Sequence, residues 1–449
     1  MRKLFGTDGI RAVAGEAPLD PKTIYAVGVA LAHQLKDKQQ PGVILGMDTR
    51  ESSEWIAAVL AAGMAKGGAA VESAGVITTP AIAYLARKHH FSAGVVISAS
   101  HNPWHDNGIK IFGGDGYKLP DEVELRIEEE IFKQLASVEA PDASTLTPPK
   151  SEPRFRAEYE EFLLSAVPGL QLGDLKLVLD CANGAASAIV PELFAKVGGT
   201  VKLTHDQPDG RNINANCGAL YPATVAAETK TTHSDIGVTF DGDADRALFA
   251  DAQGRVVNGD AILLLMARDL KAKKLLRNDL VVATTMSNMG LEAALRRDQI
   301  KMLRAPVGDK YVLEMMQANS ASLGGEQSGH ILFPHLATTG DGLLTALVVL
   351  DLVRRSGKPL HELTADLKVF PQVIVNVRVK EKQPLMQIER IAATIQAAEA
   401  ELDGNGRVVV RYSGTEPLAR VMIEAESEET MRHHADAIAE AIRSTLGVA

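Results

Sequence analysis

The sequence lacks the features that mark secreted and membrane-spanning proteins. Its 449 residues include two cysteines, Cys181 and Cys217, which cannot form a disulfide framework, so we expect free thiols in a reducing, cytoplasmic setting. Long apolar runs are missing: the most hydrophobic helical stretch, residues 343–353, contains Asp351 and is too short to span a bilayer. The first residues carry charge but no apolar signal core, so we expect no targeting segment there.

A surplus of basic residues is also missing. Lysine and arginine number 47 against 57 aspartates and glutamates, which gives a formal net charge of −10. Because non-specific nucleic-acid binding depends on basic surface, we expect neither nucleic acid nor membrane as a partner, but a small molecule. An anionic ligand would need a local basic pocket to overcome the negative electrostatic field of the whole protein. Neither a Walker A motif nor a dinucleotide fingerprint occurs, so the chain has no nucleotide cradle of these types.

Three segments share one pattern of strand, loop, helix and strand, beginning near residues 43, 177 and 280. Parallel strand pairs need such a helical crossover, so the pattern predicts three related α/β domains. A smaller piece at the C-terminus alternates strands and helices as an α+β domain would. Linker-like and turn-like stretches at 140–149, 251–255 and 370–371 then predict four domains, with bounds 1–150, 151–253, 254–369 and 370–449.

A serine at the end of a predicted strand is the first candidate for chemistry. The apolar run 94–97 predicts a buried strand, Ser100 and His101 follow it, and Pro103 prevents its continuation. Ligands of open α/β sheets bind at such carboxyl ends. A bare serine is a weak nucleophile, so Ser100 either needs a base or acts in a phosphorylated form that requires a cation. An ordinary turn is the alternative.

Three aspartates follow a second predicted strand, residues 236–240. In an extended strand Asp241, Asp243 and Asp245 would spread over about 13 Å, so only a curled loop, which Gly242 permits, brings them to one ion. Three oxygen ligands favour Mg²⁺ and leave positions open for a phosphate oxygen. A solvated acidic turn is the alternative.

Two later loops carry groups that suit a phosphorylated sugar. Glycines surround Glu326, Ser328 and His330, which can bind hydroxyls and move protons near neutral pH. Residues 411–417 combine two hydroxyls, a glycine and an arginine, as an anion nest would, with Arg420 just beyond. A polar glycine loop and a capped strand end are the respective alternatives. Together with the serine and the aspartates, these loops indicate phosphoryl transfer on a sugar phosphate.

The combination resembles the α-D-phosphohexomutase family over essentially the whole chain. The resemblance is carried, in the family's order, by residues 5–11, 98–110, 241–246, 325–330 and 411–417. The amino-acid sequence of the fourth segment, and of the stretch that begins at Gly308, resembles the bacterial branch that acts on glucosamine phosphates. The resemblance implies four domains around a central cleft, with a possible homodimer.

The resemblance also implies an activity and a set of roles. We expect interconversion of glucosamine 6-phosphate and glucosamine 1-phosphate through a phosphoserine enzyme, with Mg²⁺ as cofactor and glucosamine 1,6-bisphosphate or glucose 1,6-bisphosphate as intermediate or activator, in the supply of UDP-N-acetylglucosamine for cell-wall precursors. The implied roles are phosphoserine and donor for Ser100, metal ligation for Ser100, Asp241, Asp243 and Asp245, acid/base catalysis for Lys110 and His330, support of the phosphoserine for Arg11 and His101, and substrate binding for Arg246, Gly308, Glu326, Ser328, Arg411, Ser413, Gly414, Thr415 and Arg420.

The same motifs leave three alternatives open. A phosphomannomutase or phosphoglucomutase of the same family would keep the chemistry and change the sugar, since each discriminating contact is worth only about a few kcal/mol. A phosphatase with a phosphoserine intermediate commonly pairs metals, whereas the sequence has one carboxylate cluster. A non-catalytic sugar-phosphate sensor would not need Ser100, Lys110 and the three aspartates.

Overall fold

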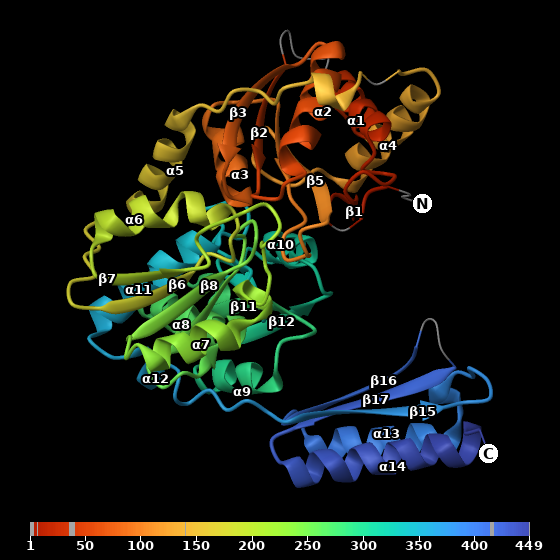
Figure 1. Ribbon diagram of the computed structural model, residues 1–449. Helices are drawn as coiled ribbons and strands as arrows, with labels where there is room; N and C mark the ends of the chain where they lie inside the picture. The colour runs from red at the N-terminus through yellow and green to blue at the C-terminus, as the bar shows by residue number, and fades with distance from the viewer. Residues whose placement is uncertain (1–3, 7, 36–40, 140, 414–416, 449) are drawn as a thin grey trace. The chain divides into compact units, whose positions relative to one another are not determined.

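The computed structural model describes residues 4–6, 8–35, 41–139, 141–413 and 417–448, which form four β-sheets (Figure 1). These residues divide into two compact units. The first contains Met1–Thr285 and Leu303–Thr364, and the second contains Met286–Met302 and Ala365–Ala449. Within the described ranges, no helix combines the length and apolar character needed to cross a membrane.

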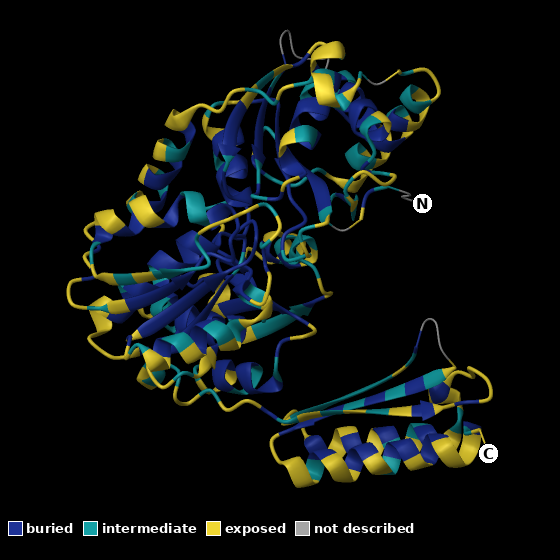
Figure 2. Ribbon diagram, viewed as in Figure 1, coloured by how far each residue is buried: buried dark blue, intermediate teal, exposed yellow. Residues whose placement is uncertain are grey.

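The first sheet has the order β1-β5-β4-β2-β3. Its strands are β1 (Ile10–Val13), β2 (Gly42–Met47), β3 (Ala70–Val76), β4 (Ala93–Ile97) and β5 (Asp106–Gly113). The central strand β2 is parallel to both neighbours, and β5 then runs antiparallel to β4. The predicted strand at 94–97 is β4, which is buried throughout. Its neighbour β2, which is labelled in Figure 1, is also mostly buried (Figure 2).

The second sheet repeats this topology with the order β10-β9-β8-β6-β7. Its strands are β6 (Lys176–Asp180), β7 (Thr200–Thr204), β8 (Ile236–Phe240), β9 (Ala247–Asp251) and β10 (Val256–Val257). Here β6 is parallel to β7 and β8, and β9 is antiparallel to β8. The turn at 251–255 joins β9 to β10, so the second sheet extends beyond residue 253, where the sequence places a boundary.

The third sheet is a shorter version with the order β12-β11-β13-β14. Its strands are β11 (Leu280–Thr284), β12 (Lys301–Ala305), β13 (Gly324–Gly325) and β14 (Ile331–Leu332). Again a parallel pair, β11 with β13, is followed by an antiparallel strand, β14. The expected set of three related α/β folds is confirmed by the shared strand order.

Helices cover the sheets of the first unit because their apolar faces match the strands. In the first sheet the core joins β2, β4 and β5 to α1 (Pro21–Gln34), α2 (Ser53–Lys66) and α4 (Asp121–Leu135). On the strands' other side Gly46 and Gly94 leave room for Ile82 of α3 (Thr79–Lys88). The remaining helices of this unit are α5 (Pro153–Ser165), α6 (Val190–Val197), α7 (Pro222–Thr231), α8 (Gly259–Ala272), α10 (Asp309–Ala318), α11 (Gly342–Ser356) and α12 (Leu360–Leu363).

The second unit contains the expected small α+β domain. Its elements are α9 (Met289–Arg297), β15 (Gln372–Arg378), α13 (Glu389–Leu402), β16 (Gly406–Tyr412), β17 (Leu418–Ala425) and α14 (Glu428–Leu446). The three strands form an antiparallel sheet of order β15-β17-β16, and α13 and α14 cover one of its faces (Figure 1). The buried Glu424 of β17 accepts the Met289 N–H of α9 at 2.7 Å, so α9 is attached to this sheet.

Candidate functional site

Ser100 lies just beyond the carboxyl end of β4 and is buried. Its backbone has φ +52°, in the left-handed region that most non-glycine residues avoid. The hydroxyl of Ser98 accepts the Ser100 N–H at 2.9 Å and helps to stabilise this turn. In this conformation the Ser100 hydroxyl donates to Asp241 Oδ2 at 2.5 Å and lies 3.3 Å from His101 Nδ1.

Two side chains that the sequence did not single out hold the Ser100 loop in place. The guanidinium of Arg50, which is buried, donates to the carbonyl oxygens of Ser100 at 3.0 Å and Asn102 at 2.8 Å. Asn214 Nδ2 donates to the same two oxygens at 2.9 and 3.1 Å. Arg50 is itself oriented by Asp48, at 2.9 Å. Asp48 directly follows β2. Its position at a strand end is a signal in the sequence that could have pointed to the Asp48–Arg50 pair.

The three predicted aspartates come together in the loop after β8. One carboxylate oxygen of each of Asp241, Asp243 and Asp245 lies within 4.8 Å of the other two, and all three residues are buried. Gly242 is needed here because a Cβ would lie 2.5 Å from the Ser100 carbonyl oxygen. The loop therefore places a buried carboxylate cluster against the serine.

The electrostatics of this cluster fit a divalent cation. Burial, with Asp245 and Asp243 beside it, raises the pKa of Asp241 well above its usual value. Asp243 Oδ1 and Asp245 Oδ1 are buried, and neither has a hydrogen-bond partner among the described residues. Lys110 Nζ donates to Asp243 Oδ2 at 2.6 Å. Crowded carboxylates with unused oxygens are the donor set that a hard cation prefers.

The loop between β13 and β14 brings a second group of predicted residues to the same site. His330 lies with Nδ1 3.6 Å from Asp245 Oδ1. Burial opposes its charged form, but Asp245, Asp309 and Glu326 outweigh burial and raise the pKa of His330 to about 9. Glu326 Oε1 accepts the N–H of Gly308 at 3.2 Å, and Ser328 is half-buried in the same loop.

The predicted cations around the serine are also present, with one correction. The glycines Gly6 and Gly9 predict a loop around Arg11, but Arg11 lies on β1, because residues 10–13 pair antiparallel with β5. Its guanidinium forms an ion pair with Asp8. Burial, with Arg246 and Arg11 beside it, lowers the pKa of His101 to about 4, so this imidazole is neutral at pH 7. The Arg246 N–H donates to Asp241 Oδ1 at 3.1 Å.

The predicted phosphate-binding residues lie in the second unit. Arg411 on β16 and Arg420 on β17 are direct partners in the antiparallel pair, so two cationic side chains share one face. The buried Ser413 donates its N–H to Leu418 O, and its carbonyl oxygen accepts Lys382 Nζ at 2.7 Å. Like charges placed opposite one another favour an anion between them. Gly414 and Thr415 lie outside the described residues.

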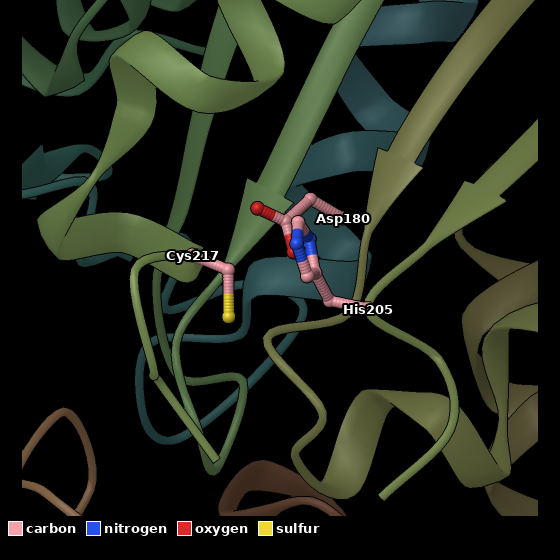
Figure 3. Close-up of side chains that lie close together, drawn as sticks. All are labelled: Asp180, His205 and Cys217. Carbon is pink, nitrogen blue, oxygen red and sulfur yellow. The ribbon is translucent and has the colours of Figure 1, made fainter. Parts of the chain in front are cut away.

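A second cluster of potential ligands, Asp180, His205 and Cys217, lies at the carboxyl end of β6 (Figure 3). The two oxygens of Asp180 accept two backbone N–H groups at 2.9 Å and the Thr239 hydroxyl at 3.0 Å, and one of them lies 3.1 Å from His205 Nδ1. Burial raises the pKa of Cys217 to about 12, so the thiol keeps its proton. The hydrogen-bonding capacity of the Asp180 carboxylate is used, and the Cys217 thiol is protonated. These two facts indicate a structural role, in which the three residues hold the strand ends of this sheet together.

Comparison with known proteins identifies one family along nearly the whole chain. Four domain descriptions of the phosphoglucomutase/phosphomannomutase family match in order: α/β/α domain I at residues 2–137, domain II at 157–254, domain III at 258–370 and the C-terminal domain at 374–441.

Full-length relatives give the same result. A phosphoglucosamine mutase of Koribacter versatilis is 58% identical, with 100% of this chain and 98% of the relative covered, and one of Solibacter usitatus is 50% identical, with 99% of each covered.

Solved structures share the fold. A phosphoglucomutase/phosphomannomutase family protein from Burkholderia thailandensis matches with a TM-score of 0.76 at 21% identity, covering 98% of this chain and 97% of that one. An Aspergillus fumigatus N-acetylphosphoglucosamine mutase, in complex with GlcNAc-6P and magnesium, matches with a TM-score of 0.65 at 20% identity over 98% and 96%. The chain therefore belongs to the phosphohexomutase family, among its phosphoglucosamine mutases.

Proposed function

We propose that this protein interconverts glucosamine 6-phosphate and glucosamine 1-phosphate, with Ser100 in its phosphorylated form as the phosphoryl donor. The full-length identity of 58% to a phosphoglucosamine mutase supports the sugar. The observation that carries the chemistry is the position of the Ser100 hydroxyl, 2.5 Å from a carboxylate of the three-aspartate cluster. A product of this kind supplies amino-sugar and cell-wall precursor synthesis.

In the proposed reaction a sugar hydroxyl oxygen attacks the phosphorus of phospho-Ser100. The new O–P bond forms as the bond to Ser100 Oγ breaks, and the hydroxyl proton passes to a base. The resulting bisphosphate turns over within the site, and Ser100 Oγ then reclaims the phosphoryl group at the other end of the sugar. One serine thus serves both ends of the substrate.

We assign the metal site to Asp241, Asp243, Asp245 and Ser100. The buried oxygens Asp243 Oδ1 and Asp245 Oδ1, which accept no hydrogen bond among the described residues, and the Ser100 hydroxyl beside Asp241 support this assignment, as does the magnesium in the Aspergillus fumigatus relative. Bound Mg²⁺ would supply neutralisation of charge on the transferring phosphoryl group.

Lys110 and His330 are the proposed acid/base pair, because both lie beside the aspartate cluster. Burial opposes the charge on Lys110, but Asp243 and Asp8 outweigh it and raise its pKa above the usual value, so the lysine is protonated in this arrangement. It can accept a proton only after these carboxylates are otherwise neutralised. His101 and Arg11 support the phosphoserine.

Substrate binding is assigned to two groups of residues, each described by itself. Glu326 and Ser328 bind sugar hydroxyls, with Gly308 and Arg246 beside them. Arg411, Ser413, Gly414, Thr415 and Arg420 bind the phosphate that does not react, and the opposed arginines support this role. We also propose that residues 1–150, 151–253, 254–369 and 370–449 act as four domains, although the pairing of β10 with β9 extends the second sheet to residue 257.

The first test is the intact mass of the purified protein. We expect a population heavier by one phosphate, with the modification on Ser100. Ser100→Ala should lose both the adduct and mutase activity while its circular dichroism and melting temperature stay close to those of the parent. A phosphate found elsewhere, or near-normal turnover by the variant, would refute the phosphoserine role.

The second test concerns the sugar. Values of kcat/KM on glucosamine, glucose and mannose 6-phosphates should rank glucosamine first, and a preference for mannose would overturn the assignment. Treatment with EDTA should abolish turnover, and added Mg²⁺ should restore it. Steady release of inorganic phosphate in excess of isomerisation would instead indicate a phosphatase.

A further inference from the structure

Two residues without a role in the proposed reaction, Lys118 and Asp309, belong to a series of ion pairs that reaches the proposed catalytic side chains. Lys118 Nζ lies 2.5 Å from Asp8 Oδ1 and 2.6 Å from Asp309 Oδ2, so one ammonium joins two carboxylates. The other oxygen of Asp8 lies 3.1 Å from Lys110 Nζ. The other end of the chain of contacts is His330, whose Nε2 lies 3.7 Å from Asp309 Oδ2.

Asp245 closes these contacts into a ring. One of its oxygens lies 3.6 Å from His330 Nδ1, and the other lies 3.8 Å from Lys110 Nζ. Acidic and basic side chains therefore alternate around the whole ring. In order, its members are Lys110, Asp8, Lys118, Asp309, His330 and Asp245. Both proposed acid/base residues are members, and the ring connects them in two ways, through Asp245 and through Asp8, Lys118 and Asp309.

Separate parts of the first unit contribute the three unassigned members. Asp8 precedes β1, Lys118 follows β5, and Asp309 is the first residue of α10. The Lys118 backbone is fixed by a β-bridge to Phe112. The turn before it is fixed as well, because the carbonyl oxygen of Gly116 accepts the Thr338 hydroxyl at 2.7 Å. Lys118 is therefore a rigidly placed cation with side-chain exposure of 19%.

The distribution of partners makes Lys118 more important to Asp309 than to Asp8. Asp8 also contacts Lys110 and Arg11, so it keeps two cations without Lys118. Within the described residues, the basic groups that contact Asp309 are Lys118 and His330. Without the ammonium, two partly buried carboxylates would face each other, and like charges at short range repel. Asp309 would then move away from Asp8, and His330 would lose one of its two orienting carboxylates.

We propose that Lys118 and Asp309 form a positioning pair that fixes His330 and, through Asp8, Lys110 relative to the aspartate cluster. Neither residue needs to touch the reacting atoms, because each acts through the side chain that it holds. The proposal rests on the proposed function for the roles of Lys110 and His330. Misplacement of a catalytic group by about 1 Å can lower a rate by about 100-fold, so the pair should affect kcat more than KM.

A cavity beside Lys118 allows a direct test of the ammonium. Its volume is about 500 Å³, and its lining includes Lys118, Asp309, Lys310, Tyr117 and Gln317. Lys118→Ala removes three carbons and the nitrogen, which is the composition of propylamine. The cavity gives added propylammonium a route to the position of the missing group, whereas 1-propanol has the same shape without the charge.

The experiment measures kcat and KM of the full-length phosphorylated enzyme on glucosamine 6-phosphate. We expect Lys118→Met to lower kcat by about 10- to 100-fold with a smaller change in KM. Lys118→Arg should recover part of the loss, and Lys118→Ala should be rescued by propylammonium but not by 1-propanol. Lys310→Met is the matched control, because Lys310 lines the same cavity but pairs with Asp121 outside the ring. It should behave like the parent.

A double-mutant cycle tests whether the two residues act as one unit. If they do, Lys118→Met combined with Asp309→Asn should be no slower than the slower single variant. A kcat of Lys118→Met within about twofold of the parent, rescue by 1-propanol as effective as by propylammonium, or additive losses in the cycle would each overturn the pair. The parent's own rate on this sugar tests the proposed function, whereas ratios of variant to parent test the pair, so the two failures are distinguishable.

Discussion

Replacing Arg50 by methionine tests how the serine loop is held. The side chain is fully enclosed and makes hydrogen bonds to Asp48 and to the carbonyl oxygens of Ser100, Asn102 and Pro103. Methionine approximates the length of the stem but supplies no donor. The change therefore removes every one of these contacts at once while adding little bulk.

Two contributions set the expected loss of unfolding free energy: the carboxylate and the carbonyl oxygens that lose the guanidinium. The carboxylate of Asp48 has no exposed surface, and removing one partner of a buried ion pair costs about 3–5 kcal/mol of unfolding free energy. The carbonyl oxygens of Ser100 and Asn102 keep the amide of Asn214, so they add little to this cost. We therefore expect a loss of about 3–5 kcal/mol in stability, and a fall in kcat of about 100-fold because the Ser100 loop loses its main donor.

The assay can be confined to the relevant part of the chain. Both tryptophans, Trp55 and Trp104, lie near the first sheet, so intrinsic tryptophan fluorescence during urea unfolding follows this region. Lys133→Met is the control, because Lys133 is 71% exposed and pairs with Glu130 on the surface of α4, which packs on the first sheet, a contact worth about 0–1 kcal/mol. Equal midpoints for the two variants would refute the energetic argument. Lost stability with unchanged kcat would refute the positioning argument.

Three further changes probe other parts of the molecule. Gly242→Ala should lower kcat with a stability loss of about 1–3 kcal/mol, since the new Cβ would lie 2.5 Å from the Ser100 carbonyl oxygen; unchanged turnover would contradict this. Both cysteines are buried, and the pKa of Cys217 is raised to about 12, so neither thiol should react with a disulfide reagent near pH 8 before unfolding; one fast-reacting thiol would be inconsistent. Burial raises the pKa of Asp341 to about 6, so its protonated form stabilises the fold below about pH 4 and this contribution is lost as pH rises through about 6; Asp341→Asn should gain stability over the parent at pH 8 and not at pH 4, as compared by melting temperature.

The elements could be predicted where the signal is local. The pattern of strand, loop, helix and strand that begins near residue 43 predicts a helix after its first strand, and α2 (Ser53–Lys66) follows β2 there. The strand over 236–240 is β8, and the carboxylates that follow it do meet in one loop. Such patterns depend on neighbours within a few residues, which the sequence displays directly. Arg11 was misplaced because the glycines around it indicate a loop, whereas its strand exists only through pairing with β5, far along the chain.

The residues that hold the site's loops and side chains in place could not be predicted, because their roles depend on contacts between segments that are distant in the sequence. Lys118 and Lys133 look alike in the sequence, yet one is 19% exposed between two carboxylates and the other is 71% exposed on α4. Arg50 likewise acts on a loop 50 residues away in sequence. A buried cation differs from a surface cation only through its surroundings, and those surroundings come from segments far apart in the sequence.

Under the proposed function, the charge balance of the site connects phosphorylation to cation binding. Lys110 contacts Asp8, Asp243 and Asp245, so its ammonium offsets part of the negative charge of the cluster. A phosphate on Ser100 would add a charge of about −1.5 to −2, and a divalent cation would add the opposite. Either charge alone would unbalance a set of buried groups, whereas both together would leave the balance nearly unchanged. Because Lys118 and Arg11 hold Asp8 in place, the contact between Asp8 and Lys110 helps to fix the position of the Lys110 ammonium.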